Sequence, residues 1–160
     1  MKLVIHDLKN IAINNDQNTK IVSDNGTIKP CINCYGCWIR TPGQCVIHDG
    51  YDNIGLLFSK CEHLIIASQC FYGGYSPFIQ NVFNRSIPYL LPYFEKRNGE
   101  THHKKRYGNN IILTAYFYGK ISAKEKETAG KLVAANGINL SARKVEIHFL
   151  DKPEDLKEII

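Results

Sequence analysis

Leu64-Ile65-Ile66-Ala67-Ser68, followed by Gln69-Cys70-Phe71-Tyr72-Gly73-Gly74-Tyr75-Ser76-Pro77, is the stretch of sequence that decides the fold. Residues 64–67 are apolar at consecutive positions, as expected for a strand buried on both faces of a parallel sheet. Ser76 and Pro77 are an N-cap residue and a first-turn proline, so a helix begins there. Its apolar face consists of Phe78, Ile79, Val82 and Phe83. The stretch therefore predicts a buried strand, a glycine-rich turn and a core-packed helix.

Similar signals recur along the rest of the chain. Short apolar runs bounded by turn residues predict four more strands, at 3–5, 21–23, 111–115 and 145–149. A helical apolar face at 54–61 follows Asp49, and Ser122 with Glu125 forms a capping box for a helix that we expect to stop at Gly137. Strands that alternate with helices in this way predict a doubly wound α/β sheet.

The composition is that of an ordinary globular domain. The chain has 160 residues, 44% hydrophobic and 22% charged, and we expect one domain over residues 1–160. The N-terminus becomes polar after three apolar residues, and no apolar run approaches membrane-spanning length. We therefore expect a cytoplasmic protein that has no membrane contact.

The net charge of +5 is concentrated in Lys96-Arg97 and in the run from His102 to Arg106. A basic loop could attract a nucleotide phosphate or an acidic electron-transfer partner, but a solvated connection between elements is the favoured interpretation. The basic stripe is short and lacks interleaved aromatic residues, so nucleic acid is excluded as a partner.

Four cysteines occur within fifteen residues, in Cys31-Ile32-Asn33-Cys34-Tyr35-Gly36-Cys37 and then at Cys45. In a reducing compartment such clusters are typical of metal binding or redox chemistry rather than of disulfides. Thiolates favour soft metal centres, and compact cysteine runs hold iron–sulfur clusters in ferredoxins. A four-iron four-sulfur cluster, a zinc ion and simple reduced thiols all remain open, because spacing alone does not fix occupancy.

Several motifs together resemble the flavodoxin-like flavoproteins, in the group of NAD(P)H-dependent FMN reductases and iron–sulfur flavoproteins. They are the segment 30–38 with its three cysteines, the segment 42–49, the segment from Ser68 to Ser76, and Asn84-Arg85. The resemblance covers roughly residues 28 to 90 well and the rest by strand order. It implies a three-layer α/β sandwich with a five-stranded parallel sheet in the order 2-1-3-4-5. It also implies FMN at the strand C-termini, NAD(P)H or a redox protein as electron donor, and a homodimer or homotetramer whose interface helps to build the site.

In that family the segment after the third strand contributes to the flavin-ring pocket. Here this segment is Ser68, Gln69, Cys70, Phe71, Tyr72, Gly73, Gly74 and Tyr75, and the residues after the fourth strand, Tyr116, Phe117, Tyr118 and Gly119, are the other candidates for lining the cleft. Ligands of open α/β sheets do bind beyond the carboxyl ends of the strands. The glycines could let backbone approach a planar ring, or the turn and its aromatic residues could simply close the core.

The N-terminal segment departs from the family pattern. Members that hold FMN usually follow the first strand with small and hydroxyl residues, whose amides wrap the phosphate at a helix N-terminus. Here the corresponding residues are Asp7-Leu8-Lys9-Asn10. Leu8, Ile11 and Ala12 have helical spacing, but Asn14-Asn15 ends the pattern, which predicts a shortened first crossover. Asp7, as a predicted N-cap, would take the amide bonds that a phosphate needs and would repel its charge.

Two functions follow. The first is an FMN-dependent oxidoreductase or electron-transfer flavoprotein, in which the flavin supplies the chemistry and no side chain acts as acid or base. The second is a flavodoxin-fold protein that has lost FMN and serves as a non-catalytic binding or partner subunit. Asp7 separates them, since it predicts FMN binding that is weakened, lost or completed by another subunit.

Overall fold

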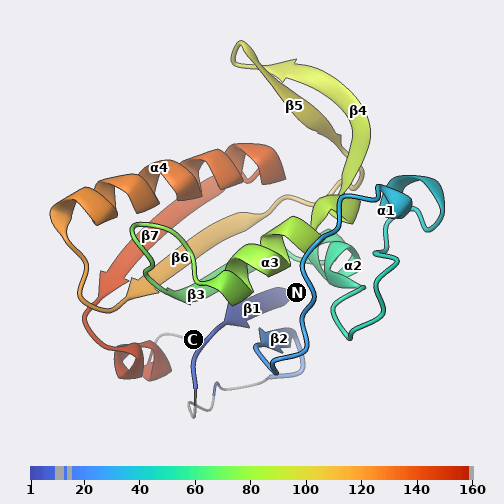
Figure 1. Ribbon diagram of the computed structural model, residues 1–160. Helices are drawn as coiled ribbons and strands as arrows, with labels where there is room; N and C mark the ends of the chain where they lie inside the picture. Colours follow the sequence, from blue (N-terminus) through green and yellow to red (C-terminus); the bar gives the residue numbers. More distant parts are fainter. Residues whose placement is uncertain (10–12, 14–15, 159–160) are drawn as a thin grey trace.

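The computed structural model describes residues 1–9, 13 and 16–158, and its centre is a parallel sheet (Figure 1). The five strands lie in the order β2-β1-β3-β6-β7, and every neighbouring pair is parallel. They are β1 (Lys2–His6), β2 (Thr19–Ser23), β3 (His63–Gln69), β6 (Ile112–Tyr118) and β7 (Lys144–Leu150). Numbered along the chain within this sheet alone, the order is 2-1-3-4-5, so the predicted topology is confirmed.

Burial explains why the central strands read as continuous apolar runs. Leu3, Val4 and Ile5 of β1 are fully buried, and so are the residues at the middle of β3. The outer strands β2 and β7 instead mix exposed and partly buried positions. Central parallel strands are covered on both faces, whereas edge strands meet water along one side.

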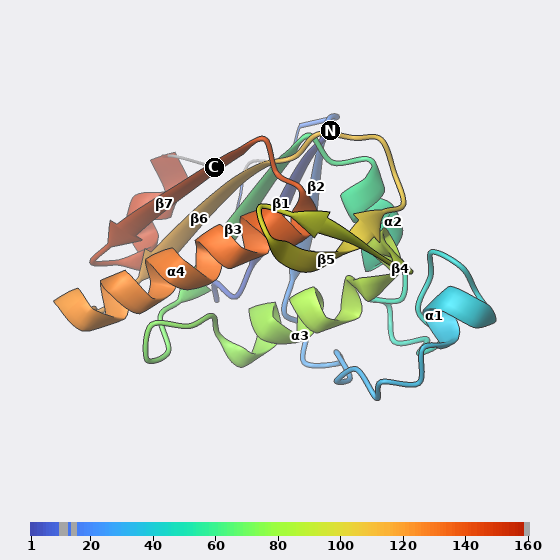
Figure 2. The same cartoon turned by 90° about the horizontal axis from the view of Figure 1, so that it is seen from above.

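Three helices cover one face of the sheet, as Figures 1 and 2 show for α3 and α4. They are α2 (Ile54–Ser59), α3 (Pro77–Arg85) and α4 (Ala123–Leu140), and all three contribute to one large apolar cluster with the sheet. The predicted caps are confirmed: the Ser76 side chain accepts a bond from the amide of Ile79, and Ser122 forms the capping box with Glu125. None of the described helices has the length and apolar character needed to cross a membrane.

The expected helix stop at Gly137 is wrong. Helix α4 continues to Leu140 and ends at Ser141, which adopts the left-handed conformation with φ 53°. Gly137 lies inside the helix against Val145 of β7, where a Cβ atom would collide with the valine side chain. This glycine therefore permits a close helix–strand approach instead of ending the helix.

The opposite face of the sheet carries a much smaller cluster, made of Val4, Leu8, Ile65, Ala67 and Leu156. Leu156 belongs to the short 3-10 helix η2 (Pro153–Glu158), which lies against this face. The predicted short helix after β1 includes Ile11 and Ala12, which lie outside the described residues. Leu8, its first apolar position, is buried as expected.

The basic connection that we expected to be solvated is an antiparallel hairpin that projects from the body of the molecule (Figure 1). Its strands are β4 (Leu90–Arg97) and β5 (Glu100–Lys105), joined by Asn98-Gly99 with φ values of 51° and 85°. Two positive φ values are the signature of the tight turn that Asn-Gly favours. Arg97 anchors the hairpin by donating to the Ile138 carbonyl at 2.9 Å and to the Ser141 hydroxyl at 2.6 Å.

Candidate functional site

The carboxyl ends of β1, β3 and β6 meet at the point where the strand order reverses, which is where ligands of such sheets bind. Asp7 directly follows β1. Its carboxylate accepts bonds from the backbone amide of Gln69 at 3.0 and 3.2 Å and from the Tyr118 hydroxyl at 2.9 Å. We call Asp7, Gln69 and Tyr118 the edge cluster, and it joins the ends of all three strands.

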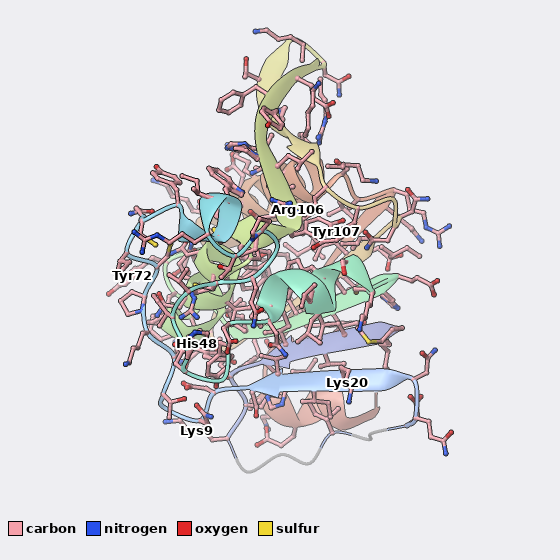
Figure 3. The ribbon with its side chains drawn as sticks, turned by 90° about the vertical axis from the view of Figure 1, so that its right-hand side faces the viewer. Lys9, Lys20, His48, Tyr72, Arg106 and Tyr107 are labelled. Atoms are coloured by element: carbon pink, nitrogen blue, oxygen red, sulfur yellow. The ribbon has the colours of Figure 1, made fainter. Side chains whose placement is uncertain are left out.

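The edge cluster places a negative charge among neutral donors. Burial and the Asp7 charge together raise the pKa of Tyr118 well above its usual range, so the hydroxyl stays protonated and donates to Asp7. Burial lowers the pKa of His6, and its Nδ1 accepts the Leu8 amide at 3.2 Å, so this imidazole is neutral. Lys9 is exposed and labelled in Figure 3. Among the described residues, the donors on Asp7 are an amide and a hydroxyl.

Within the part of the chain that the structure describes, Asp7 accepts a backbone amide bond from Gln69 at the end of β3. The predicted helix whose amides Asp7 would cap includes residues 10–12, which lie outside the described residues. A phosphate at this position would have to displace the Asp7 carboxylate from Gln69 and Tyr118, and like charges would repel. The edge cluster does not fit a phosphate dianion.

The segment from Ser68 to Tyr75, which we predicted to contact the flavin ring and call the ring segment, forms a tight turn that its own hydrogen bonds hold together. Ser68 is buried; its hydroxyl donates to the Gln69 carbonyl at 2.9 Å and accepts from the Ser76 amide at 2.8 Å. Phe71 and Gly74 pair through two backbone bonds. Phe71 is 41% exposed and Tyr72 is 90% exposed. Tyr72 lies at the surface of the molecule in Figure 3. These two aromatic faces are the part of the segment that is open to a ligand.

Gly73 and Tyr75 serve packing. A Cβ atom on Gly73 would lie 2.7 Å from Cβ of Thr128 and 2.9 Å from the Glu125 carbonyl oxygen, so this glycine approaches helix α4 closely. Tyr75 is buried between Phe83 and Phe117, with ring centroids 5.0 and 5.2 Å away. At these two positions the geometry supports the interpretation that the turn closes the core.

The expectation that Tyr116, Phe117 and Tyr118 follow the fourth sheet strand is wrong, because all three lie inside β6 and only Gly119 follows it. Their side chains divide between the two faces of the sheet. Phe117 packs under the helices, whereas Tyr116 stacks on His148 on the opposite face with centroids 4.8 Å apart. Tyr118 reaches the edge cluster, and its carbonyl accepts the Cys70 amide at 3.1 Å. Alternation along a strand explains the division, and it separates side chains that the sequence places in one group.

The four clustered cysteines are free thiols: Cys31, Cys34, Cys37 and Cys45. Burial raises the pKa of the Cys37 thiol to about 11, and the neighbouring Cys45, Cys31 and Cys34 add to this effect. In the part of the chain that the structure describes, no three His, Cys, Asp or Glu side chains are grouped as metal ligands. The observed arrangement fits reduced thiols rather than a preformed cluster or zinc site.

Arg85 holds the segment of residues 29–49, which contains the four clustered cysteines and which we call the cysteine segment. Its side chain is fully buried and donates to both Asp49 carboxylate oxygens at 2.8 and 3.0 Å, to the carbonyls of Lys29 and Ile47, and to the Cys45 sulfur at 3.1 Å. Burial alone would raise the pKa of Asp49, but the bonds from Arg85 and from the amides of Lys29 and Tyr51 lower it to about 2. Arg85 therefore ties α3 to the cysteine segment.

Cys61 and Cys70 differ in burial. Cys61 is fully buried, and burial raises its pKa to about 12, which suits a small apolar residue. Cys70 is partly buried in the predicted ring segment, and burial raises its pKa as well.

Comparisons with known proteins identify the fold. No family model matches the sequence, and no curated protein matches it. Among solved structures, the chain is similar to an FMN-dependent NADH-azoreductase from Bacillus anthracis str. Ames Ancestor in complex with FMN, with a TM-score of 0.55. The two are 9% identical, and the match covers 98% of this chain and 92% of that one. With the strand order above, this similarity confirms the flavodoxin-like α/β fold.

Proposed function

We propose that the protein is a flavin-dependent oxidoreductase of the flavodoxin type that holds the flavin mainly by its ring and only weakly by its phosphate. The observation that carries the proposal is the edge cluster, which lies at the ligand-binding edge of the fold but fills one part of it with a carboxylate. The similarity to a solved FMN-dependent NADH-azoreductase supports a nicotinamide as the electron donor.

The residues of this chain would contribute position and electrostatics. Phe71 and Tyr72 offer exposed aromatic faces for a planar ring, and the strand-end backbone at Gln69 lies next to them. Bound flavin would supply the acceptance of two electrons from a nicotinamide and their release to an acceptor. Tyr118 keeps its proton because burial and Asp7 raise its pKa, so it acts as a hydrogen-bond donor and not as a base. We retain a homodimer or homotetramer as the proposed assembly.

An absorbance spectrum of freshly purified protein, kept free of oxygen, tests this function. We expect less than one flavin per chain as purified and a saturable flavin spectrum after FMN is added. Reduced nicotinamide or reduced ferredoxin should then bleach that spectrum. If added flavin at millimolar concentration leaves the spectrum equal to the sum of its parts, the oxidoreductase proposal fails.

A second function is favoured by one specific contact. Because Asp7 already engages the Gln69 amide and the Tyr118 hydroxyl, the chain could be a flavodoxin-fold partner subunit that binds no flavin. This function predicts a colourless protein that cannot be reconstituted with flavin and that copurifies with a catalytic subunit.

Whether the four cysteines take up a cluster after rearrangement is tested separately. Iron and acid-labile sulfide should be measured on protein purified without oxygen. The lack of a ligand grouping among the described residues leads us to expect neither. Iron and sulfide near four per chain would instead make the cysteine segment an electron carrier.

A further inference from the structure

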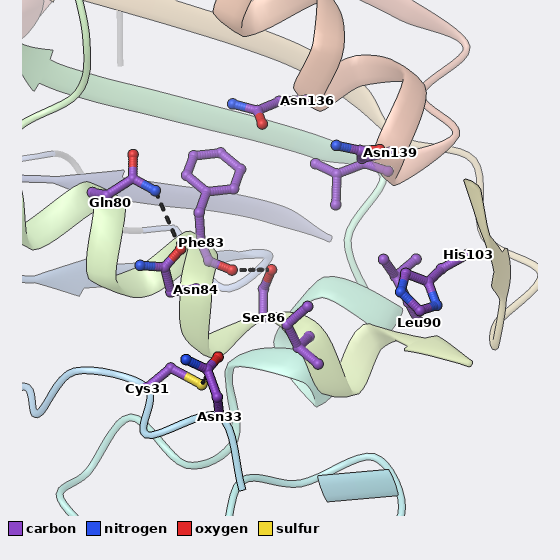
Figure 4. Close-up of a pocket in the computed structure, with 12 residues that line it drawn as sticks. Cys31, Asn33, Gln80, Phe83, Asn84, Ser86, Leu90, His103, Asn136 and Asn139 are labelled. Atoms are coloured by element: carbon purple, nitrogen blue, oxygen red, sulfur yellow. Dashed lines mark hydrogen bonds between the residues drawn. The ribbon is translucent and has the colours of Figure 1, made fainter. Parts of the chain in front are cut away.

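A cavity of about 480 Å³ lies between α3, α4, the hairpin and the cysteine segment (Figure 4). It is formed near the C-terminal ends of α3 and α4, as the lining residues Asn84 and Asn139 show. Both helices start at the carboxyl edge of the sheet. The nine residues of α3 span roughly 13 Å at about 1.5 Å per residue, so the cavity lies well away from the edge cluster.

The polar wall of this cavity is built from five carboxamide side chains: Asn33, Gln80, Asn84, Asn136 and Asn139. Among the described residues that line it, none carries a formal charge at neutral pH, apart from the titratable Cys31 and His103. Such a wall suits a neutral group that can both donate and accept, because each carboxamide offers two N–H donors and one carbonyl.

The carboxamides are only partly used within the protein. Gln80 donates to Asn84 at 3.2 Å, as drawn in Figure 4, and Asn136 donates to the Tyr75 hydroxyl at 3.3 Å. Asn139 pairs with His102 at 3.1 Å. These bonds orient the side chains and leave further N–H and carbonyl positions for a ligand.

The histidine on the wall is a further acceptor. Nδ1 of His103 lies 2.8 Å from the Leu91 carbonyl, and because a carbonyl only accepts, Nδ1 carries the proton. A neutral His103 then has Nε2 as an acceptor. Its ring also contacts two aromatic rings in tilted arrangements, with centroids 5.1 Å from Trp38 and 4.5 Å from Phe94.

Apolar side chains complete the cavity beside the carboxamides. They are Phe83, Ile87, Leu90 and Leu140. A ligand that matches this lining is flat and apolar on its faces and carries adjacent donors and acceptors on its edge. Asparagine and glutamine recognise adenine in this way, through paired bonds to its amino group and ring nitrogen. The volume lies within the range of small-molecule sites.

We propose that this cavity is a binding site for an adenine base, of a free adenine nucleoside or nucleotide or of the adenine end of a dinucleotide. The site does not depend on flavin. Adenine is neutral at pH 7, which matches a wall of carboxamides that contains no Asp, Glu, Lys or Arg among the described residues. Its amino group would donate to a carboxamide oxygen or to Nε2 of His103, and its ring nitrogen would accept from a carboxamide N–H.

Isothermal titration of the full chain, without flavin, tests the site, with adenosine, AMP, NADH and uridine as probes. Trp38 is the single tryptophan, and it contacts two lining residues: its ring meets that of His103 in a tilted arrangement, and its Nε1 donates to the Leu90 carbonyl at 3.0 Å. Its fluorescence therefore reports where a ligand binds. We expect adenosine to bind with a Kd below about 1 mM, to change Trp38 fluorescence, and to bind at least about tenfold more tightly than uridine. AMP or NADH binding more tightly than adenosine would identify the natural source of the base.

A double variant, Asn84→Leu with Asn139→Leu, should weaken adenosine binding about tenfold or more, because both positions are exposed and their loss leaves the fold intact. Asn53→Leu is the matched control, since Asn53 is exposed and makes no capping bond. Equal binding by the double variant and the control would overturn the proposal, and so would adenosine that does not bind at all. A flavin titration that fails would leave this result unaffected.

Discussion

Asp49 and Asp7 are both held by several hydrogen bonds, but their donors differ in charge. Asp49 receives the Arg85 guanidinium and two backbone amides, and the pKa of its carboxyl falls to about 2. Asp7 receives the Gln69 amide and the Tyr118 hydroxyl. The negative charge of Asp49 is balanced by Arg85, and this ion pair links the cysteine segment to α3. The negative charge of Asp7 meets only neutral donors among the described residues, so it acts on any ligand that binds at this edge.

The largest expected effect concerns the ion pair of Asp49 with Arg85. Arg85→Met leaves Asp49 buried without its cation, and removing one partner of a buried pair costs about 3–5 kcal/mol. Urea unfolding followed by circular dichroism measures this loss. Arg40→Met, at an exposed position, should change the free energy of unfolding by less than about 0.5 kcal/mol. If both variants lose the same free energy of unfolding, the buried ion pair of Arg85 with Asp49 does not stabilise the fold as we infer.

The ring segment offers a test of packing. Gly73→Ala should destabilise the protein by about 1–3 kcal/mol more than Gly99→Ala does. Both glycines have positive φ, 81° and 85°, but only Gly73 lies against Thr128 and Glu125, while Gly99 faces open space. Thermal unfolding of the two variants isolates the close approach. If the Gly73 variant is no less stable than the Gly99 variant, Gly73 is not needed for packing against α4 and the turn remains available for contact with a flavin.

The pH dependence of stability reports on Asp49. Its folded pKa of about 2 lies below its ordinary value of 3.8, so its contribution is complete above about pH 4 and is lost as the pH falls toward 2. The loss should be roughly 2 kcal/mol across this window, at about 1.4 kcal/mol for each pKa unit. Asp49→Asn should have a flatter stability curve over the same range in acid-titrated urea unfolding. An unchanged curve would contradict the assignment.

Tyr72 should matter least for stability. Its ring is 90% exposed, so Tyr72→Ala should change the free energy of unfolding by no more than about 0.5 kcal/mol. If the ring stacks on a flavin, the same variant should weaken flavin binding severalfold, measured by quenching of flavin fluorescence. If Tyr72→Ala changes neither the stability nor the flavin affinity, Tyr72 is not part of the proposed site.

Local patterns predicted the parts of this molecule that local chemistry determines. The strand, turn and helix around Leu64 to Phe83 form as expected, and so does the capping box at Ser122. The Asn98-Gly99 hairpin carried its own signal, which the surrounding basic residues obscured. Gly137 looked like a helix end because close packing against β7 depends on a partner that sequence spacing does not reveal.

The candidate site was harder to predict, because its contacts join distant residues. Asp7 meets Gln69 across 62 positions and Tyr118 across 111, and Arg85 meets Asp49 across 36. The sequence pointed to the carboxyl ends of the strands and to Asp7, and the structure joins the ends of β1, β3 and β6 through Asp7. That a flavin binds there stays a prediction. The sequence did not separate Phe117 from Tyr116 and Tyr118, since strand alternation assigns faces only once the register of β6 is known.

Flavin titration of the purified chain and of Asp7→Asn tests the central claim most directly, with Asp151→Asn as an exposed control of the same charge change. Fluorescence quenching gives the affinities for FMN and riboflavin. We expect the unmodified chain to bind riboflavin at least as well as FMN. Asp7→Asn should tighten FMN about tenfold, or about 1.4 kcal/mol, with little change for riboflavin. If no variant binds either flavin, or if Asp7→Asn leaves the preference unchanged, the account of this edge as a flavin site weakened by Asp7 is contradicted.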